Sequence, residues 1–253
     1  MVDYELQGRV AVLTLNRPEA RNAVNGDVAK GMEAAIDRVE EDENVWVAIL
    51  THNGPVFSAG ADLKAINAGQ VGELQTKRGG FAGFVQRQRT KPVIAAVDGP
   101  AFAGGCEIAL ACDLIVASTQ AKFGLPEVKR SLVAAAGGLF RLPRVLPRPV
   151  ALEMIMTGDP IDAERAYQFG LVNDLCAPGE TLERAHALAA RIAANAPLAV
   201  RKSREISLAS VDAADDVGWK LSAESMNELA QTEDFWEGPK AFIEKRDPVW
   251  KGK

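Results

Sequence analysis

The chain has 253 residues, of which 47% are hydrophobic and 25% charged, and its formal net charge at pH 7 is -5. These values are ordinary for a globular protein, and the acidic balance offers no broad basic field that would attract the phosphates of nucleic acid or of a membrane surface. The three cysteines lie in apolar runs, which predicts reduced thiols in a cytoplasmic protein. The N-terminal residues do not have the pattern of a secretory signal, and no apolar stretch reaches the roughly 18 residues that a membrane span needs.

The first part of the chain predicts strands that alternate with helices. Period-two and continuous apolar runs predict strands at residues 4–7, 9–15, 45–51 and 92–97. Apolar residues at helical spacing predict helices at residues 27–41, 62–68 and 76–89, the last one weakened by its glycines. This alternation favours an α/β fold with crossover connections.

Residues 101–127 carry the chemistry that the sequence suggests. A glycine pair, Gly104 and Gly105, opens a predicted helix over residues 104–112, and Glu107 follows one turn later. The N-terminus of a helix presents free backbone N–H groups and a partial positive charge, so an anionic oxygen could be held beside this acid. Strands are expected at residues 114–118 and 121–124, and a second carboxylate, Glu127, follows directly.

After residue 134 helical patterns dominate. We expect helices at residues 137–145, 151–157, 163–170, 182–196, 198–209 and about 215–232, and a single strand at 171–175. Prolines precede several of these helices, at positions where their missing N–H is not needed. We expect a core over residues 1–196 and a C-terminal helical region over residues 197–253, with no flexible linker between them.

Four ordered blocks give the chain its likeness to a known family. They read LNRPEARNAVN (15–25), FSAGADLK (57–64), KPVIAAVDGPAFAGGCEIALACDLIVAS (91–118) and AKFGLPE (121–127). With them the chain resembles the crotonase (enoyl-CoA hydratase/isomerase) superfamily over essentially its whole length. The GGFAG run at 79–83 and the tail GPKAFIEKRDPVWKGK are most similar to carnitinyl-CoA dehydratase within that superfamily. The resemblance implies a spiral of ββα units and a C-terminal helical region used in trimerisation, with hexamers as dimers of trimers.

The resemblance also implies roles for individual residues. Members bind acyl-CoA thioesters and hold the thioester oxygen with two backbone N–H groups, which here would belong to Ala61 and Gly104. Glu107 and Glu127 match the two catalytic glutamates of family hydratases, one to activate water and one to supply the α proton. Such a carboxylate pair is expected to have separated pKa values.

Further positions would bind the substrate. By likeness, Arg21 and the segment Ala61, Asp62, Leu63 and Lys64 would line the nucleotide and pantetheine side of CoA. Phe242 and Lys245 would reach the CoA of a neighbouring subunit. Residues 74–89 would line part of the acyl pocket. CoA belongs to the substrate, so no separate cofactor or metal is expected.

One departure from the family pattern bears on the rate. Family hydratases carry a proline and a glycine after the second glutamate, where this chain has Ala134 and Ala135. That turn helps to place the catalytic water and the second glutamate, so the exchange affects the expected hydratase rate and not the fold.

The residues thus favour an enoyl-CoA hydratase-type hydro-lyase. A carnitinyl-CoA dehydratase-like enzyme and an enoyl-CoA isomerase remain open alternatives, the isomerase because it needs only one glutamate. The non-enzyme alternative is a weakly active acyl-CoA-binding protein. A Ser–His–Asp hydrolase is disfavoured, because His52 and His186 stand outside the blocks and neither is placed like a triad base.

Overall fold

A computed structural model describes all residues, 1–253. Its main sheet has six strands in the order β1-β2-β3-β6-β8-β11; β1 and β2 pair antiparallel, and the other neighbours pair parallel. The strands of this sheet are β1 (Val2–Gln7), β2 (Val10–Leu15), β3 (Val47–His52), β6 (Val93–Val97), β8 (Leu114–Ser118) and β11 (Asp174–Cys176). Strands β3 and β6 are buried over almost their whole length, as their continuous apolar sequences predict.

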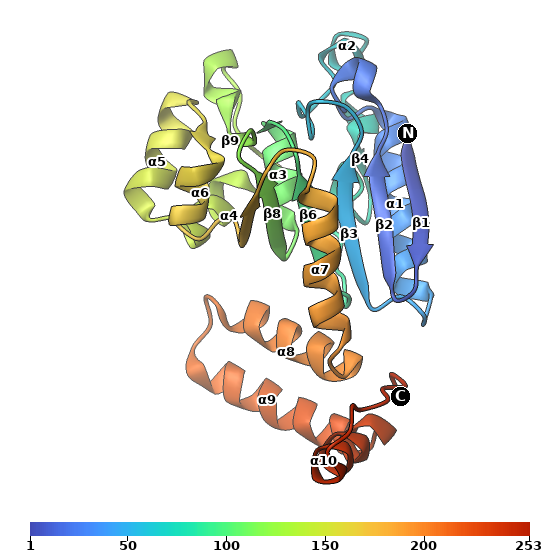
Figure 1. Cartoon of the computed structure of the whole chain (residues 1–253). Coiled ribbons are helices and arrows are strands. Elements are labelled where there is room, and N and C mark those ends of the chain that lie inside the picture. The colour runs from blue at the N-terminus through green and yellow to red at the C-terminus, as the bar shows by residue number, and fades with distance from the viewer.

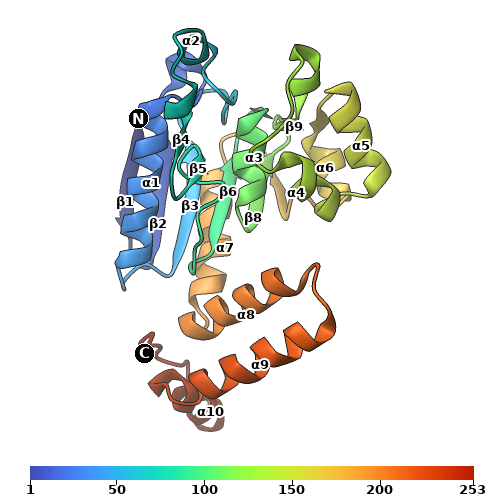
Figure 2. The same ribbon diagram turned by 180° about the vertical axis from the view of Figure 1, so that it is seen from behind.

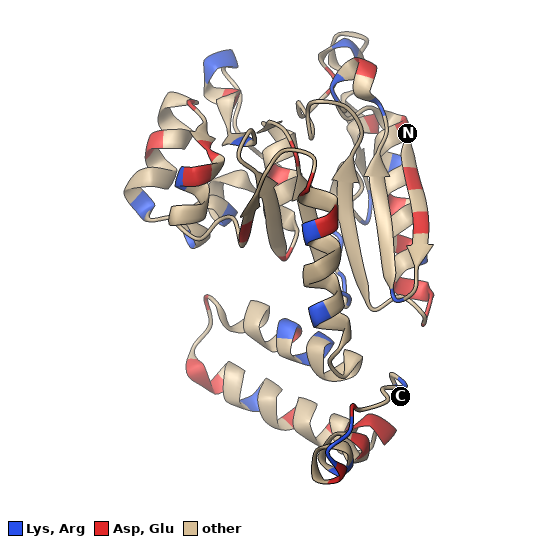
Figure 3. Cartoon of the chain, viewed as in Figure 1, with Lys and Arg blue, Asp and Glu red and all other residues tan.

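Helices cover both faces of this sheet. The α-helices are α1 (Gly26–Glu41), α2 (Leu63–Asn67), α3 (Gly104–Ala111), α4 (Gly138–Val145), α5 (Arg148–Thr157), α6 (Ala163–Gln168), α7 (Thr181–Ala193), α8 (Pro197–Ser210), α9 (Asp215–Leu229) and α10 (Glu233–Glu244). Helix α1 covers the face seen in Figure 2, and α7 lies across the face seen in Figure 1. The central strands between them carry no charged side chains (Figure 3).

A smaller sheet lies beside the main one. It joins β10 (Ile161–Asp162), β9 (Lys122–Gly124) and β7 (Ala101–Phe102) in that order, with β7 and β9 parallel. Strand β7 leads directly into α3, and β9 leads into the 3₁₀ turn η3 (Pro126–Arg130). This sheet therefore holds the two carboxylate-bearing segments of the sequence next to each other.

Two capping interactions fix α1, the longest helix of the core. At its N-terminus the side chain of Asn25 accepts a hydrogen bond from the N–H of Val28 at 3.0 Å. At its C-terminus the buried ammonium of Lys91 donates to the carbonyls of Val39, Glu40 and Asp42. The lysine of the KPVIAAV block is thus a helix cap, which explains how a fully buried charge is tolerated.

The C-terminal helices α8, α9 and α10 form a tier below the sheet, at the opposite end of the molecule from α2 (Figure 1). Arg204 of α8 forms an ion pair of 2.8 Å with Asp113, and the indole of Trp250 donates to the carbonyl of Ala194 at 2.8 Å. Few residues of this tier are buried, and its apolar side chains include Trp219, Trp236 and Phe242, which are largely exposed.

The helix expected at residues 76–89 is not present. The segment forms a short hairpin, β4 (Gln75–Thr76) with β5 (Gly80–Phe81), followed by turns. A Cβ at Gly79 would lie 2.1 Å from the backbone of Gly83, and one at Gly83 would lie 2.1 Å from the carbonyl oxygen of Ala29. These glycines let the segment pack tightly against α1. The prediction of a helix was wrong because it treated the glycines as residues that merely weaken a helix.

The C-terminal pattern also differs from the expectation. The helix expected over residues 215–232 ends at Leu229, and a further helix, α10, follows it. Thr232 caps α10 by accepting a hydrogen bond from the N–H of Phe235 at 3.2 Å. Pro239 lies inside α10 and hid it from a sequence reading, since proline ordinarily breaks a helix.

Candidate active site

The loop after β3 holds Ala61 with its backbone N–H free. Ala61 bridges Val24, and the two hydrogen bonds of that bridge belong to its neighbours: the N–H of Val24 donates to Gly60, and the N–H of Asp62 donates to Val24. In such a parallel bridge the central residue directs its own N–H to the other side. No protein group accepts a hydrogen bond from this N–H.

The N-terminus of α3 supplies a second free donor. Its first residue, Gly104, donates its N–H to no protein group. The preceding Ala103 has φ 52° and ψ -129°, a conformation that is costly for a residue with a Cβ. Hydrogen bonds from the N–H of Ala103 to the carbonyl of Gly124, and from the N–H of Glu107 to the carbonyl of Ala103, hold this strained turn. The helix dipole adds partial positive charge at the same point.

Gly60 brings the two donors together. Its φ is 88°, and a Cβ at this position would lie 2.8 Å from the backbone nitrogen of Gly104 and 2.8 Å from the Cβ of Ala103. No side chain fits between the two backbones, so the loop before Ala61 lies directly against the start of α3. Two free backbone donors on segments in such close contact are placed to hold one developing oxyanion between them.

The ring of Phe81 packs on the outer side of Gly104. A Cβ on Gly104 would lie 2.4 Å from this ring, so the glycine is required by an aromatic wall as well as by the turn. Phe81 comes from the hairpin that replaced the expected helix. The segment expected to line an acyl pocket therefore does contact the predicted oxyanion residue, through a side chain that the sequence did not single out.

Glu107 lies one helical turn further along α3 and is buried. Its Oε1 accepts a hydrogen bond of 2.9 Å from the N–H of Gly138, at the N-terminus of α4. Burial raises the pKa of Glu107 to about 7, and the nearby charge of Glu127 adds to the rise; the N–H of Gly138 and the guanidinium of Arg141 act in the opposite direction. A carboxyl group with this pKa can either accept or donate a proton near neutral pH.

Glu127 lies in the first turn of η3, partly buried. Its Oε2 is shielded from solvent and accepts no hydrogen bond. Burial raises the pKa of this carboxyl group as well. Burial raises the pKa of the Cys106 thiol, and the charges of both glutamates add to the rise. The pairing of β7 with β9, the strands that lead to the two glutamates, brings their segments to the same region. A buried carboxyl oxygen without a donor favours the protonated form.

The turn at Ala134 and Ala135, which departs from the family pattern, leads into the start of α4, where the N–H of Gly138 binds Glu107. Ala134 is buried, and Gly137 and Gly138 still begin α4 and hold Glu107. Arg141 of α4 braces this turn by donating to the carbonyl of Ala136 at 3.2 Å and to that of Val85 at 2.6 Å. The expected effect of Ala134 and Ala135 on the rate stays a prediction.

Arg141 was missed by the sequence reading. In an amphipathic helix an arginine is ordinarily a surface cation, so no role for Arg141 was predicted from the sequence. One of its two acceptors, the carbonyl of Val85, lies 56 residues away along the chain. The regular GGLFRL spacing places it one turn after the glycine pair, and that spacing is the one local signal that could have found it.

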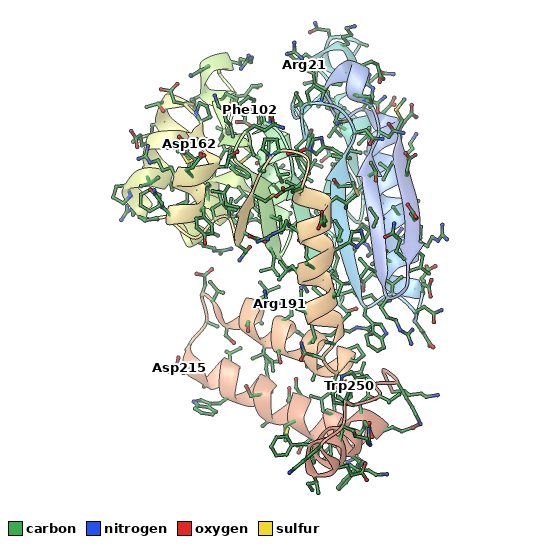
Figure 4. The ribbon with its side chains drawn as sticks, in the orientation of Figure 1. Arg21, Phe102, Asp162, Arg191, Asp215 and Trp250 are labelled. Carbon is green, nitrogen blue, oxygen red and sulfur yellow. The ribbon has the colours of Figure 1, made fainter.

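The residues expected on the CoA side divide into two kinds. Asp62 is buried; its carboxylate caps α2 and forms an ion pair of 2.6 Å with Arg17, so its charge is used within the protein. Leu63 and Lys64 are exposed at the start of α2, and Arg21 is exposed after the turn at residues 18–20, at the upper end of the molecule (Figure 4). The backbone of Arg21 accepts a hydrogen bond from the N–H of Ala59 at 3.0 Å, which keeps it beside the loop of Ala61.

Phe242 and Lys245 lie elsewhere in the chain. Both belong to the end of α10, in the C-terminal tier, far from α2 in Figure 1. Phe242 is 86% exposed, and Lys245 forms no ion pair. Within one chain these two residues do not join the site of Ala61 and Gly104.

The geometry gives little support to a metal site or to a histidine-based hydrolase. No group of three or more His, Cys, Asp or Glu side chains is arranged to hold a metal ion. The Nε2 atom of His52 accepts a hydrogen bond from the backbone N–H of Asp98, and its ring packs edge-on against Phe57. None of the helices combines the length and the apolar character of a membrane-spanning helix.

Comparisons with known proteins agree with this geometry. Residues 5–253 match the family profile described as enoyl-CoA hydratase/isomerase. The chain is 41% identical to carnitinyl-CoA dehydratase of Salmonella typhimurium, over 97% of this chain and 96% of that protein.

Solved structures show the same fold. The enoyl-CoA hydratase of Mycobacterium tuberculosis H37Rv superposes with a TM-score of 0.96 at 45% identity, covering 100% of this chain and 99% of that one. A carnitinyl-CoA hydratase of Mycobacterium avium superposes with a TM-score of 0.80, also at 45% identity, covering 100% of this chain and 98% of that one. The α/β fold expected from the sequence is therefore confirmed as the crotonase fold.

The burial of Glu107 predicts a pH-dependent cost to stability. Because its folded-state pKa is about 7 against an ordinary 4.5, its contribution is fully present below pH 4.5 and is lost as the pH rises through 7. The free energy of unfolding of Glu107→Gln should equal that of the wild type near pH 4.5. Above pH 7 it should be higher than that of the wild type by up to about 3 kcal/mol. Urea denaturation from pH 4.5 to 8.5, at one protein concentration, measures this gap.

The matched control is Glu183→Gln, on the exposed face of α7. It should show no gap that grows with pH. A constant difference between Glu107→Gln and the wild type at every pH would contradict a buried, titrating carboxyl group.

Proposed function

This chain belongs to the enoyl-CoA hydratase/isomerase family, and we propose that it is a hydro-lyase that adds water to a 2-enoyl-CoA or removes it from a 3-hydroxyacyl-CoA. The proposal is supported by two backbone N–H donors without protein acceptors on segments in close contact, and by two carboxyl groups of raised pKa, one of them in the first turn after Gly104. The donors stabilise the thioester oxygen as negative charge develops there, and the carboxyl groups move the protons.

In this proposal Glu107 is the base and Glu127 the acid. Glu107 takes a proton from water while the hydroxide adds to C3, and the resulting enolate oxygen is held by the N–H groups of Ala61 and Gly104. Glu127 then gives its proton to C2, and a proton passes from Glu107 to Glu127 to restore the starting state. The donor on Glu107, the N–H of Gly138, favours the carboxylate, whereas Glu127 has an oxygen without a donor.

The likeness to named relatives supports a second substrate for the same chemistry. A carnitinyl-CoA dehydratase is 41% identical to this chain, so elimination of water from a carnitinyl-CoA thioester is the alternative that we keep. Isomerisation of a 3-enoyl-CoA needs only one of the two glutamates. The scheme requires no cofactor beyond the CoA of the substrate, since side chains and backbone N–H groups carry every step.

We also propose how CoA is bound. Arg21 and Lys64 are exposed cations on segments next to Ala61, Lys64 in the first turn of α2, where they can pair with the phosphates of CoA. The segment Ala61–Lys64 would line the pantetheine, with the exposed side chain of Leu63 offering apolar contact. Asp62 would act through the shape of this loop, because its carboxylate is already paired with Arg17.

The C-terminal tier supports an oligomer. We propose that residues 197–253 form a helical region that packs against other copies of the chain, beside a core of residues 1–196, in a homotrimer or a hexamer of paired trimers. Three large apolar side chains of α9 and α10, those of Trp219, Trp236 and Phe242, are each more than two-thirds exposed in the single chain. In the oligomer Phe242 and Lys245 would reach the CoA of a neighbouring subunit.

The two-carboxylate mechanism predicts which variants lose turnover. With crotonyl-CoA, Glu107→Gln and Glu127→Gln should each lower kcat by at least about 100-fold, because either proton transfer is then lost. Steady-state hydration and the reverse dehydration measure this, with Glu183→Gln as the control. If Glu127→Gln keeps full activity the scheme fails, and turnover of carnitinyl-CoA or 3-hexenoyl-CoA alone would select one of the two alternatives.

The proximity of the two donors predicts a contrast between two glycines. Gly60→Ala and Gly69→Ala both place a Cβ on a residue of positive φ, but only the first meets other atoms, since nothing lies within 4 Å at Gly69. Gly60→Ala should lower kcat for crotonyl-CoA by about 100-fold or more, as expected when an oxyanion donor is displaced. Gly69→Ala should change it by no more than about twofold. Equal effects of the two changes would show that backbone strain, and not the donor geometry, controls the rate.

The proposed contact of Lys245 with the CoA of a neighbouring subunit predicts a change in KM. Lys245→Gln should raise the KM for crotonyl-CoA by about tenfold with kcat nearly unchanged, because it removes a charged partner of CoA and leaves the reacting atoms alone. Lys240→Gln, an exposed lysine of the same helix, is the control. Sedimentation of both proteins should give the wild-type trimer or hexamer. A monomer of full activity would contradict the proposed role of Phe242 and Lys245.

A further inference from the structure

Ser58 is a fully buried residue that touches both halves of the predicted oxyanion site. Its hydroxyl donates to the carbonyl of Asn22 at 2.8 Å and accepts a hydrogen bond of 3.2 Å from the N–H of Gly60. Its carbonyl accepts a hydrogen bond of 3.0 Å from the N–H of Phe102, in β7, which leads into α3. One residue thus joins the loop of Ala61 to the strand that starts α3.

The helix itself also rests on Ser58. A Cβ on Gly105 would lie 2.2 Å from the carbonyl oxygen of Ser58, so the second glycine of the pair lets α3 approach this residue. Ser58 further bridges Ala101 in β7. These contacts set how far the first turn of α3 lies from the loop before Ala61.

Asn22 holds Ser58 from the other side. It is buried, at φ 52°, a left-handed conformation that asparagine accepts better than most residues. Its side-chain N–H₂ donates to the carbonyls of Asn53 and Val56, at 2.9 and 2.8 Å, and its side-chain oxygen accepts from the N–H of Arg17 at 2.8 Å. Every hydrogen-bonding group of this side chain is engaged, so Asn22 is held rigidly.

We propose that Ser58, fixed by Asn22, is the positioning residue that sets the separation of the two oxyanion donors, the N–H groups of Ala61 and Gly104. This inference rests on the proposed function and extends it to residues that do not touch the substrate. The hydroxyl of Ser58 orients the Gly60–Ala61 peptide, and its carbonyl orients β7 and the start of α3. A displacement of about 1 Å between such groups can lower a rate by about 100-fold.

The central variant is Ser58→Ala, which leaves the N–H of Gly60 and the carbonyl of Asn22 without their partner. The matched control is Ser118→Ala, because Ser118 is equally buried and its hydroxyl forms no hydrogen bond. We expect Ser58→Ala to lower kcat for crotonyl-CoA by about 10- to 100-fold with KM changed by less than about threefold. Ser118→Ala should leave both constants within about twofold of the wild type.

A second readout reports the donors without turnover. Infrared difference spectra of bound butyryl-CoA, labelled with ¹³C at the thioester carbonyl, show how strongly the N–H groups polarise that carbonyl. The wild type and Ser118→Ala should lower the carbonyl stretching frequency by the same amount, and Ser58→Ala should lower it less. A residue that only stabilises the fold would leave the frequency of the bound thioester unchanged.

The outcomes separate the two claims. If the wild-type protein does not shift the carbonyl of bound butyryl-CoA, the proposed oxyanion site is wrong. If the wild type shifts it and Ser58→Ala shifts it equally, the positioning role of Ser58 is wrong while the proposed function stands. Should Ser58→Ala fail to fold, Asn22→Gly carries the same test, because glycine keeps the left-handed backbone but removes the side chain that fixes the position of the Asn22 carbonyl, the acceptor of the Ser58 hydroxyl; it too should weaken the shift, and a full shift would overturn the inference.

Discussion

Gly60 lies so close to the start of α3 that no side chain fits between the two backbones, and the candidate site depends on this contact. The loop after β3 and the helix after β7 come from separate parts of the chain; the loop contains the N–H of Ala61 and the helix begins with that of Gly104, and neither has a protein acceptor. Only when the two backbones touch can both donors serve one oxygen. The glycines at 60, 104 and 105 each remove a Cβ that would collide with a neighbouring group, and Ala103 keeps a strained conformation at the same place.

The acid/base pair follows from a balance between burial and donors. Burial raises the pKa of both glutamates, and at each one a backbone N–H and a nearby guanidinium oppose the rise: those of Gly138 and Arg141 at Glu107, and its own N–H and Arg130 at Glu127. The two differ in that Oε2 of Glu127 accepts no hydrogen bond. The turn before α4 is also connected to the segment of Phe81, because Arg141 donates to the carbonyls of Ala136 and Val85, and the N–H of Val85 donates to the carbonyl of Phe81. The aromatic wall, the oxyanion donor and the acid are therefore braced by one another.

Much of this arrangement could be predicted from the sequence, and the failures have a common cause. Strands such as β3 and β6 were predicted because continuous apolar runs are a local signal, and α3 was predicted with its glycine start. Residues 76–89 were read as a helix because the glycines there are explained only by contacts with α1, far along the chain. Arg141 and Ser58 have ordinary local sequence contexts, and each has a partner dozens of residues away, Val85 for Arg141 and Asn22 for Ser58. Such partners become visible only in the fold.

The central claim is that the N–H groups of Ala61 and Gly104 jointly hold a thioester oxygen beside Glu107 and Glu127. A crystal structure of the protein with a bound, unreactive acyl-CoA such as butyryl-CoA tests it most directly. The account predicts the thioester oxygen about 3 Å from both backbone nitrogens, with C2 and C3 of the acyl chain facing the two carboxyl groups. A thioester oxygen that contacts neither nitrogen, or an acyl chain that lies away from both glutamates, would contradict it.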